Sequence, residues 1–147
     1  MSLPQLSTDR FTPETGLRIT VQVPEPHVAQ LVEAILTHDA LIYGDYDRVT
    51  FRTAPGIQQF RALGTGRNAA TDDTVEVPCT ELSVFVQNNS AATATLIEAI
   101  YAAHPYEEPV IFVQETLRCL HIRGMDEHNP NRFWNAGPQD WVPEEHR

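Results

Sequence analysis

The chain has 147 residues, a formal net charge of −10 and 41% hydrophobic residues. A chain of this length and composition forms one domain with a core that needs no disulfide or metal for stability. Its ten basic residues are all arginines. The acidic balance repels phosphate backbones and anionic lipid headgroups, which argues against nucleic acid and membranes as partners. No stretch resembles a transmembrane span or the apolar part of a signal peptide, so we expect a cytoplasmic location.

The only cysteines are Cys79 and Cys119. Two isolated cysteines match neither a zinc signature nor a disulfide framework. We expect free thiols in or near a core, because the fold predicted below separates the strands that carry them.

The first third of the chain indicates an arm, a strand and a helix. Residues 1–16 contain two prolines and little periodicity, which predicts an irregular arm. Residues 17–23 alternate apolar and polar side chains, the pattern of a half-buried strand. Pro26 fits a first helical turn, and apolar residues recur at helical spacing from Val28 to Leu36.

The middle of the chain indicates shorter strands. Residues 48–53 alternate as in a strand, Pro55-Gly56 is a turn pair, and residues 57–63 return, which predicts a hairpin. A polar loop follows. A short strand is expected at 74–77, and residues 81–87 are typical of a central strand because both faces are apolar.

The last third begins with a helix and ends in an aromatic tail. Asn88-Asn89-Ser90 offers several N-caps for a helix that runs into His104-Pro105. A strand starts at Val110 and extends toward Cys119. Residues 121–147 lack periodicity, yet they hold Phe133, Trp134 and Trp141. Such aromatics usually pack on something, so we expect the tail to dock on its own sheet or on a neighbouring subunit.

An internal repeat defines the fold class. LVEAI at 31–35 and LIEAI at 96–100 each follow an alternating strand and precede another strand, which predicts two strand–helix–strand units. Together they give an α+β, ferredoxin-like βαββαβ antiparallel sheet with two helices on one face and an inserted β-hairpin. The first and third main strands should be central. The other sheet face is left without helices, which favours an oligomer.

One candidate site is the helix-to-strand corner, where His104, Tyr106, Glu107 and Glu108 occur within five residues. Imidazole and carboxylate groups suit a divalent metal ion, with His104 and Glu107 as ligands. The alternative is structural, with His104 ending the helix and Tyr106 packing on the sheet. The two adjacent glutamates should point to opposite faces of an extended backbone, which argues against an acid–base pair.

A second candidate cluster follows the first helix and holds Tyr43, Asp45, Tyr46, Asp47 and Arg48. If the two halves are related by a pseudo-twofold, this cluster and the His104 corner should lie at the same end of the sheet. They would then line one cleft or meet in an oligomer interface. The alternative is a turn in which Asp45 bonds its own backbone.

Several segments together resemble the middle domain of the YqfO (Nif-three-like) family. The matching pieces read VQVPEPHVAQLVEAIL, YGDYDRVTFRTAPGIQQFRALG, LSVFVQ and LIEAIYAAHPYEEPVIFV, within residues 17–119. The resemblance extends to the CutA and PII-like trimers, which share the ferredoxin-like fold. It implies a domain at 17–120, flanked by the arm at 1–16 and the tail at 121–147.

The resemblance also shapes the functional expectation. We expect this protein to lack the outer segments that supply a dinuclear metal site in full-length YqfO-family proteins. The resemblance therefore implies a non-enzymatic oligomer, with a trimer favoured, that is regulatory or binds a small ligand or metal ion and requires no cofactor. The candidate ligand-binding residues are His104, Tyr106, Glu107, Tyr43, Asp45 and Arg48.

Two alternatives remain open. One is a metal-dependent hydrolase or GTP cyclohydrolase-like enzyme with a site built between subunits from His104, Glu107, Tyr43 and Asp45. The other is a protein-interaction module that uses its aromatic tail.

Overall fold

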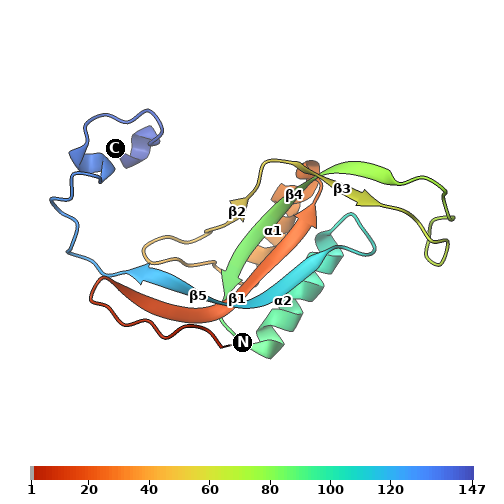
Figure 1. Ribbon diagram of the computed structural model, residues 1–147, viewed down its shortest axis with the longest axis horizontal. Helices are drawn as coiled ribbons and strands as arrows, with labels where there is room; N and C mark the ends of the chain where they lie inside the picture. The colour runs from red at the N-terminus through yellow and green to blue at the C-terminus, as the bar shows by residue number, and fades with distance from the viewer. Residues whose placement is uncertain (1) are drawn as a thin grey trace.

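The computed structural model describes residues 2–147 as an α+β protein (Figure 1). Four strands form the main sheet in the order β2-β4-β1-β5, and β3 pairs with the far part of β4. The strands are β1 (Phe11–Val23), β2 (Phe51–Arg52), β3 (Gly56–Phe60), β4 (Val75–Val86) and β5 (Ile111–His121). The helices are η1 (Glu25–His27), α1 (Val28–Leu36), α2 (Ser90–Ala103), η2 (Phe133–Asn135) and η3 (Glu144–His146).

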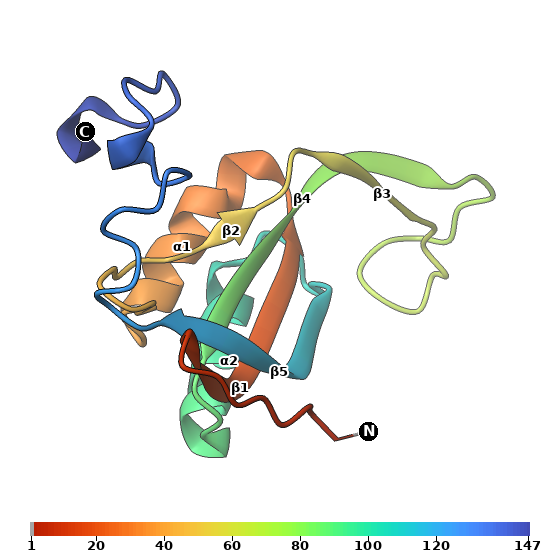
Figure 2. The same ribbon diagram turned by 60° about the vertical axis from the view of Figure 1, so that its left-hand side comes forward.

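The strand order confirms the ferredoxin-like arrangement, with the first and third main strands, β1 and β4, at the centre. Both helices lie on one face of the sheet (Figure 2). Alternate residues of the central strands point into the core that the helices close. The core comprises Leu17, Ile19, Val21, Val23, Val28, Leu31, Ile35, Leu41, Leu82, Val84, Val86, Leu96 and Ile100.

Local sequence accounts for both ends of α2. The Asn89 side chain accepts a hydrogen bond from the Ala92 N–H at 3.1 Å, which identifies the N-cap among the three expected. Pro105 disfavours the helical region for the residue before it. His104 accordingly ends the helix in an extended conformation, with φ −76° and ψ 140°.

The N-terminal boundary differs from the expectation. Strand β1 begins at Phe11, so only the described residues 2–10 form an irregular arm. The extra residues are ordered by β5, because pairing continues from Val21–Ile111 out to Phe11–His121. Beyond the end of β4 the two strands form a ribbon of their own. Pro13 lies within this ribbon rather than in irregular backbone.

The prediction that residues 48–53 and 57–63 pair with each other as a hairpin is wrong. Strands β2 and β3 do not pair with each other; both pair with β4, which is continuous where we expected two short strands. Thr53 carries the pairing across the gap: its N–H donates to the Glu81 carbonyl, and its hydroxyl accepts from the Glu81 N–H, both at 3.0 Å. The inserted hairpin is therefore β3 with the first half of β4, an arm that projects from the sheet (Figure 1).

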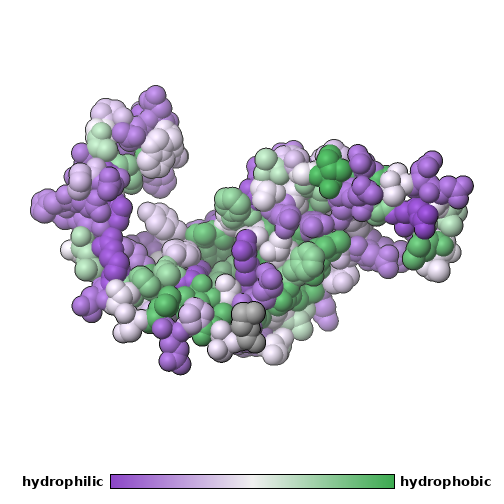
Figure 3. All heavy atoms as spheres, viewed as in Figure 1, coloured by the Kyte–Doolittle hydropathy of each residue, from purple (hydrophilic) through white to green (hydrophobic). Residues whose placement is uncertain are grey.

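The sheet face opposite the helices is open. The register aligns Phe51, Ser83, Thr20 and Phe112 in one row across four strands of this face. The hydroxyls of Thr20 and Ser83 lie 3.2 Å apart in the middle of the row. At its two ends, Phe51 is 66% exposed and Phe112 is 51% exposed. Figure 3 looks onto this face and shows hydrophobic residues among hydrophilic ones.

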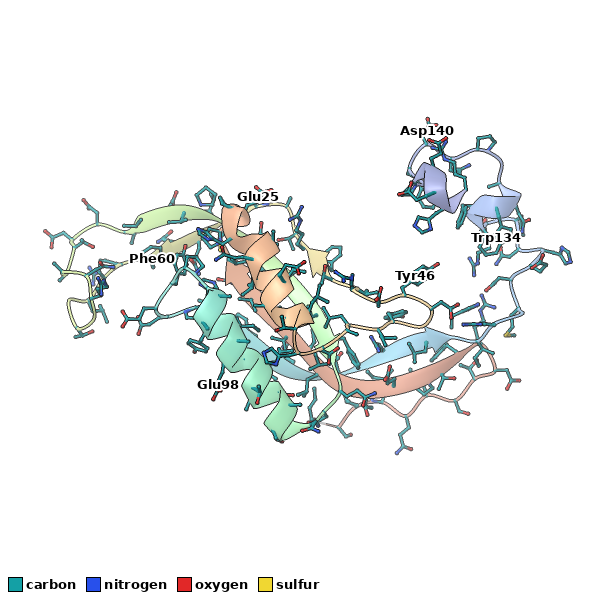
Figure 4. All side chains as sticks on the ribbon, turned by 180° about the vertical axis from the view of Figure 1, so that it is seen from behind. Glu25, Tyr46, Phe60, Glu98, Trp134 and Asp140 are labelled. Carbon is teal, nitrogen blue, oxygen red and sulfur yellow. The ribbon has the colours of Figure 1, made fainter. Side chains whose placement is uncertain are left out.

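The aromatic tail does not dock on its own sheet, which corrects one of the two expected alternatives. It extends away from the body (Figure 1), and Trp134 and Asp140 lie far from the sheet (Figure 4). Phe133 instead packs edge-on against Trp134 and Trp141, with ring centroids 5.2 and 6.2 Å away. Trp141 remains 72% exposed.

One buried carboxylate joins the tail to the domain. Asp126 accepts hydrogen bonds from Arg10 of the arm and from Arg132 and Asn129 of the tail, and His121 at the end of β5 lies 3.4 Å away. The bond from Arg10 is the main cause that lowers the pKa of Asp126 to about 2. The charged form of this carboxyl is therefore favoured by folding.

Gly16 should tolerate no side chain. A Cβ there would lie 2.3 Å from the Phe85 ring and 2.6 Å from the Val86 carbonyl oxygen. We expect Gly16→Ala to lower the free energy of unfolding by about 1–3 kcal/mol, the usual cost of overpacking. Urea unfolding measures it. Gly66→Ala is the matched control, because a Cβ at Gly66 meets nothing within 4 Å. Equal stability of the two variants would contradict this packing.

Asp126→Ala should release the tail, because it removes the shared partner of Arg10 and Arg132. Limited trypsin digestion, followed by mass spectrometry, should then cut after Arg123 and Arg132 severalfold faster than in the wild type. Asp140→Ala, at an exposed position of the same tail, is the control and should digest like the wild type.

The stabilisation that the Asp126 hydrogen bonds give should also depend on pH. The carboxyl of an unfolded chain titrates near 3.8 and the folded one near 2. The stabilisation is therefore complete above the unfolded pKa and is lost as the pH falls through the folded pKa.

Unchanged digestion of Asp126→Ala at neutral pH would contradict the digestion prediction, because it would show that other contacts hold the tail.

Candidate functional site

His104 is buried at the corner between α2 and β5, where both of its ring nitrogens are engaged. Its Nδ1 accepts the backbone N–H of Tyr106 at 3.0 Å. The ring proton therefore lies on Nε2, which donates to the Gln22 carbonyl oxygen at 2.8 Å. The imidazole thus joins the end of α2 to the end of β1, which is the structural alternative considered above.

The environment of His104 favours the neutral ring. Burial is the main cause that lowers its pKa from the ordinary 6.5; the Gln22 carbonyl opposes this and nearby His27 adds to it. Protonation of Nδ1 would also set two donors against each other, since that nitrogen accepts the Tyr106 N–H. The hydrogen bonds of His104 and the direction of its pKa shift both favour the neutral imidazole.

Other polar groups are buried around this corner. Tyr106 packs against His104 with ring centroids 5.0 Å apart. Burial, followed by the neighbouring Cys79, raises the pKa of the Tyr106 phenol. Within residues 2–147, the Tyr106 hydroxyl, His27 Nδ1 and Gln58 Oε1 are buried without a hydrogen-bond partner. Such groups usually have a partner, so the corner has unused capacity to bind a small polar species.

The residues of the corner fit a metal ion poorly. No group of three or more histidine, cysteine, aspartate or glutamate side chains suited to a metal occurs among the described residues. Glu107 is exposed, and Glu107 and Glu108 lie in bends rather than in the extended backbone we expected. A metal at His104 would have to replace one of its two hydrogen bonds. The metal assignment to His104 and Glu107 stays a prediction.

The second candidate cluster is a loop held against the β1–β5 ribbon. The Tyr43 hydroxyl donates to the Cys119 carbonyl, and Asp45 pairs with Arg123 rather than with its own backbone. Arg48 is exposed and adopts a positive φ of 55°, and its N–H donates to the Ala40 carbonyl at 2.8 Å. These contacts give Tyr43 and Asp45 structural roles in fastening the loop.

The two candidate clusters lie at opposite ends of the sheet, so our expectation of a shared end is wrong. His104 bonds Gln22 near the end of β1, whereas Tyr43 bonds Cys119 near the end of β5. The cause is the antiparallel pairing of β1 with β4, which makes the two strand–helix units run in opposite directions. One subunit cannot combine His104 and Tyr43 in one site.

Arg118 is the residue of interest that the sequence reasoning missed. It lies under the Tyr43 loop, with its guanidinium 3.8 Å from the Phe85 ring centroid and 4.8 Å from that of Tyr43. Its Nε donates to Glu14 at 2.8 Å. The only hint in the sequence is an arginine within an otherwise apolar-rich strand, and the pairing with Glu14 is visible only in the fold.

Both cysteines are free, and β1 separates their strands as expected. Cys79 is buried, but Cys119 is exposed, so the expectation of a thiol in or near the core is wrong for Cys119. Burial raises the pKa of the Cys79 thiol, which disfavours the reactive thiolate. No helix among residues 2–147 has the length and apolar character needed to cross a membrane.

Comparisons with known proteins identify the fold. Neither a family model nor a curated protein matches the sequence. A Bacillus cereus protein related to NIF3 superposes with a TM-score of 0.60 and 21% identity, over 76% of this chain and 28% of that one. This chain therefore spans just over a quarter of that protein's length.

Two CutA structures also superpose, over most of their own length. Synechococcus elongatus CutA gives a TM-score of 0.52 and 18% identity, over 75% of this chain and 86% of that one. The divalent ion tolerance protein CutA1 of Ehrlichia chaffeensis gives 0.51 and 13%, over 74% and 84%. The NIF3-like and CutA-like fold anticipated from the sequence is confirmed.

His104 should make stability depend on pH in the mildly acidic range. The unfolded chain takes up a proton near pH 6.5, and the folded chain resists it. The contribution of His104 is therefore complete above about 6.5 and is lost as the pH falls toward the lower, folded pKa. Urea unfolding between pH 5 and 8 measures the slope, and His104→Gln should reduce it.

Tyr106→Phe is the control for this prediction, because it removes a hydroxyl but keeps the backbone N–H that Nδ1 accepts. It should retain the wild-type pH dependence. If His104→Gln and the wild type show the same slope, the buried neutral imidazole is not the origin of the effect.

Proposed function

We propose that this protein is a non-catalytic, self-assembling protein that acts by binding, as a regulator or small-ligand carrier, with a trimer as its assembly. The open sheet face is the observation that carries this proposal. Phe51 and Phe112 end one row of that face and are each more than half exposed. Exposed apolar surface of this kind typically marks an interaction site.

The arm formed by β3 and the start of β4 supports the same proposal. Four large apolar side chains on or beside it are exposed: Ile57, Phe60, Leu63 and Val75. A two-stranded ribbon without a packed face is marginally stable alone in water. A second copy of the chain packed against the arm and the open face would bury both surfaces at once.

The His104 corner is the proposed ligand site of this assembly. Its buried, unpartnered groups on Tyr106, His27 and Gln58 support binding of a small polar species. Tyr43, Asp45 and Arg48 remain candidates for a separate role at the opposite end of the sheet. A divalent cation is a further proposal, which rests on likeness to a protein called a divalent ion tolerance protein. A cytoplasmic location is a separate proposal, which rests on the sequence alone.

A protein-interaction role for the tail is the second candidate. One observation favours it: Trp134 and Trp141 are 53% and 72% exposed on a segment held away from the domain. Tryptophan is enriched where proteins contact partners. The enzyme alternative has less support, because a site combining His104 with Tyr43 would require two copies to meet end to end.

Light scattering with size-exclusion chromatography tests the assembly. We expect the wild-type chain to elute as an oligomer, and Phe112→Glu to shift it toward the monomer because a charge would be buried in the interface. Tyr101→Glu on α2 is the matched control, since Tyr101 is an aromatic residue that is also 51% exposed.

A monomeric wild type would contradict the assembly proposal, as would equal dissociation by both variants. Circular dichroism of each variant establishes that the fold is retained.

A further inference from the structure

A cleft of about 630 Å³ opens at the end of the sheet opposite His104. Its lining comes from parts of three segments: the turn at 38–44 after α1, the stretch 85–96 from the end of β4 into α2, and Glu14, Arg118 and Leu120 of the ribbon. Apart from Arg118, none of the candidate site residues described above lines it. Its volume is within the range of small-molecule sites.

Arg118 and the start of α2 favour negative charge in the cleft. Arg118 is held in place by Glu14 and by the Ile42 carbonyl, which its Nη2 contacts at 2.9 Å. Its side chain is only 17% exposed. These two hydrogen bonds use Nε and Nη2 of the guanidinium and leave out Nη1. The first turn of α2 borders the same space at Asn89 and Ala92; its Ala92 N–H is already capped by Asn89, and the helix dipole favours negative charge there.

Two carboxylates in the lining, one of them the Arg118 partner Glu14, favour positive charge. Glu14 uses one carboxylate oxygen for Arg118, and Asp39 uses one for the Leu41 N–H at 2.7 Å. Each carboxylate therefore keeps a second oxygen able to accept a hydrogen bond. The C-terminal end of α1 meets the cleft at His38 and Asp39, and carbonyl groups at a helix end attract cations.

Apolar side chains complete the lining, with contributions from Ile42, Phe85, Leu96 and Leu120. Thr93 also lines the cleft. It is 8% exposed, and its hydroxyl has no hydrogen-bond partner among the described residues. A buried hydroxyl on the wall of a cleft is a group that a polar ligand can satisfy.

We propose that this cleft binds a small zwitterion, a free α-amino acid with an apolar side chain. The carboxylate would contact Arg118 and the start of α2, and the ammonium would contact Glu14 and Asp39. The apolar side chain would lie against Ile42 and Leu96. A purely anionic ligand fits less well because two carboxylates line the site, and a purely cationic one because Arg118 does. The inference adds a ligand class to the proposed binding function but uses a different site from the His104 corner.

Isothermal titration of the full chain tests the ligand class with three probes: L-leucine, L-leucinamide and N-acetyl-L-leucine. Leucinamide lacks the carboxylate, and the acetylated form lacks the ammonium. L-leucine should bind, and each of the other two should bind at least about tenfold more weakly, as expected for loss of a hydrogen-bonded charge. Equal binding of either analogue would overturn the assignment of a zwitterion.

Variants locate the site. Ala92 is exposed and lines the cleft, whereas Ala94 is exposed on the same helix and does not line it. Ala92→Trp should abolish leucine binding by filling the entrance, and Ala94→Trp should leave it unchanged. Arg118→Gln should weaken it at least about tenfold, because a charged partner is lost.

Unchanged leucine binding in Ala92→Trp would show that the cleft is not the site. If none of the twenty amino acids produces heat with the wild type, the proposal fails. Isothermal titration measures leucine binding to the cleft whether the protein is a monomer or an oligomer. Failure here is therefore distinguishable from failure of the assembly proposal, which light scattering measures.

Discussion

The antiparallel pairing of β1 with β4 is the constraint on which the rest of the structure depends. Its register sets Ile19 opposite Val84 and Val21 opposite Leu82, so that the apolar residues of both strands share one face. A slip of one residue would turn these side chains to the opposite face, away from both helices. The pairing therefore decides where α1 and α2 pack and which face stays open. It also makes the two halves of the chain run in opposite directions.

That opposition separates the functional features of the molecule. The His104 corner and the arm formed by β3 and the start of β4 lie at one end of the sheet. The Tyr43 loop and the cleft beside Arg118 lie at the other. At the first end, an imidazole with both nitrogens bonded stabilises the junction of α2 and β1. At the second, Arg118 is paired with Glu14, and the cleft that they line also contains the carboxylate of Asp39. His104, in the most conspicuous sequence motif, thus has a structural role. Arg118, which belongs to no motif, lines the cleft proposed to bind a ligand.

The open face of the sheet and the arm formed by β3 and the start of β4 are the surfaces available for assembly. A ferredoxin-like sheet with both helices on one side leaves its other side to solvent or to a partner. Here that side carries exposed phenylalanines at the two ends of one row. The tail, held by Asp126, stays away from this face, so the chain does not cover it itself. A second copy is the occupant that the proposed function requires.

Local sequence is enough to predict the two strand–helix–strand units, the helix boundaries and the extended conformation of His104. These depend on local rules: periodicity, the Asn89 cap, and the restriction that Pro105 imposes on its neighbour. Tertiary structure alone decided which edge takes β2 and β3. Thr53 bridges to Glu81, and a long β4 accepts both strands, so the Pro55-Gly56 pair does not reverse the chain. It also decided the ends of the sheet at which His104 and Tyr43 lie, and the meeting of Arg118 with Glu14, 104 residues apart in the chain. Such pairings depend on strand direction and register, which are properties of the whole sheet rather than of any one segment.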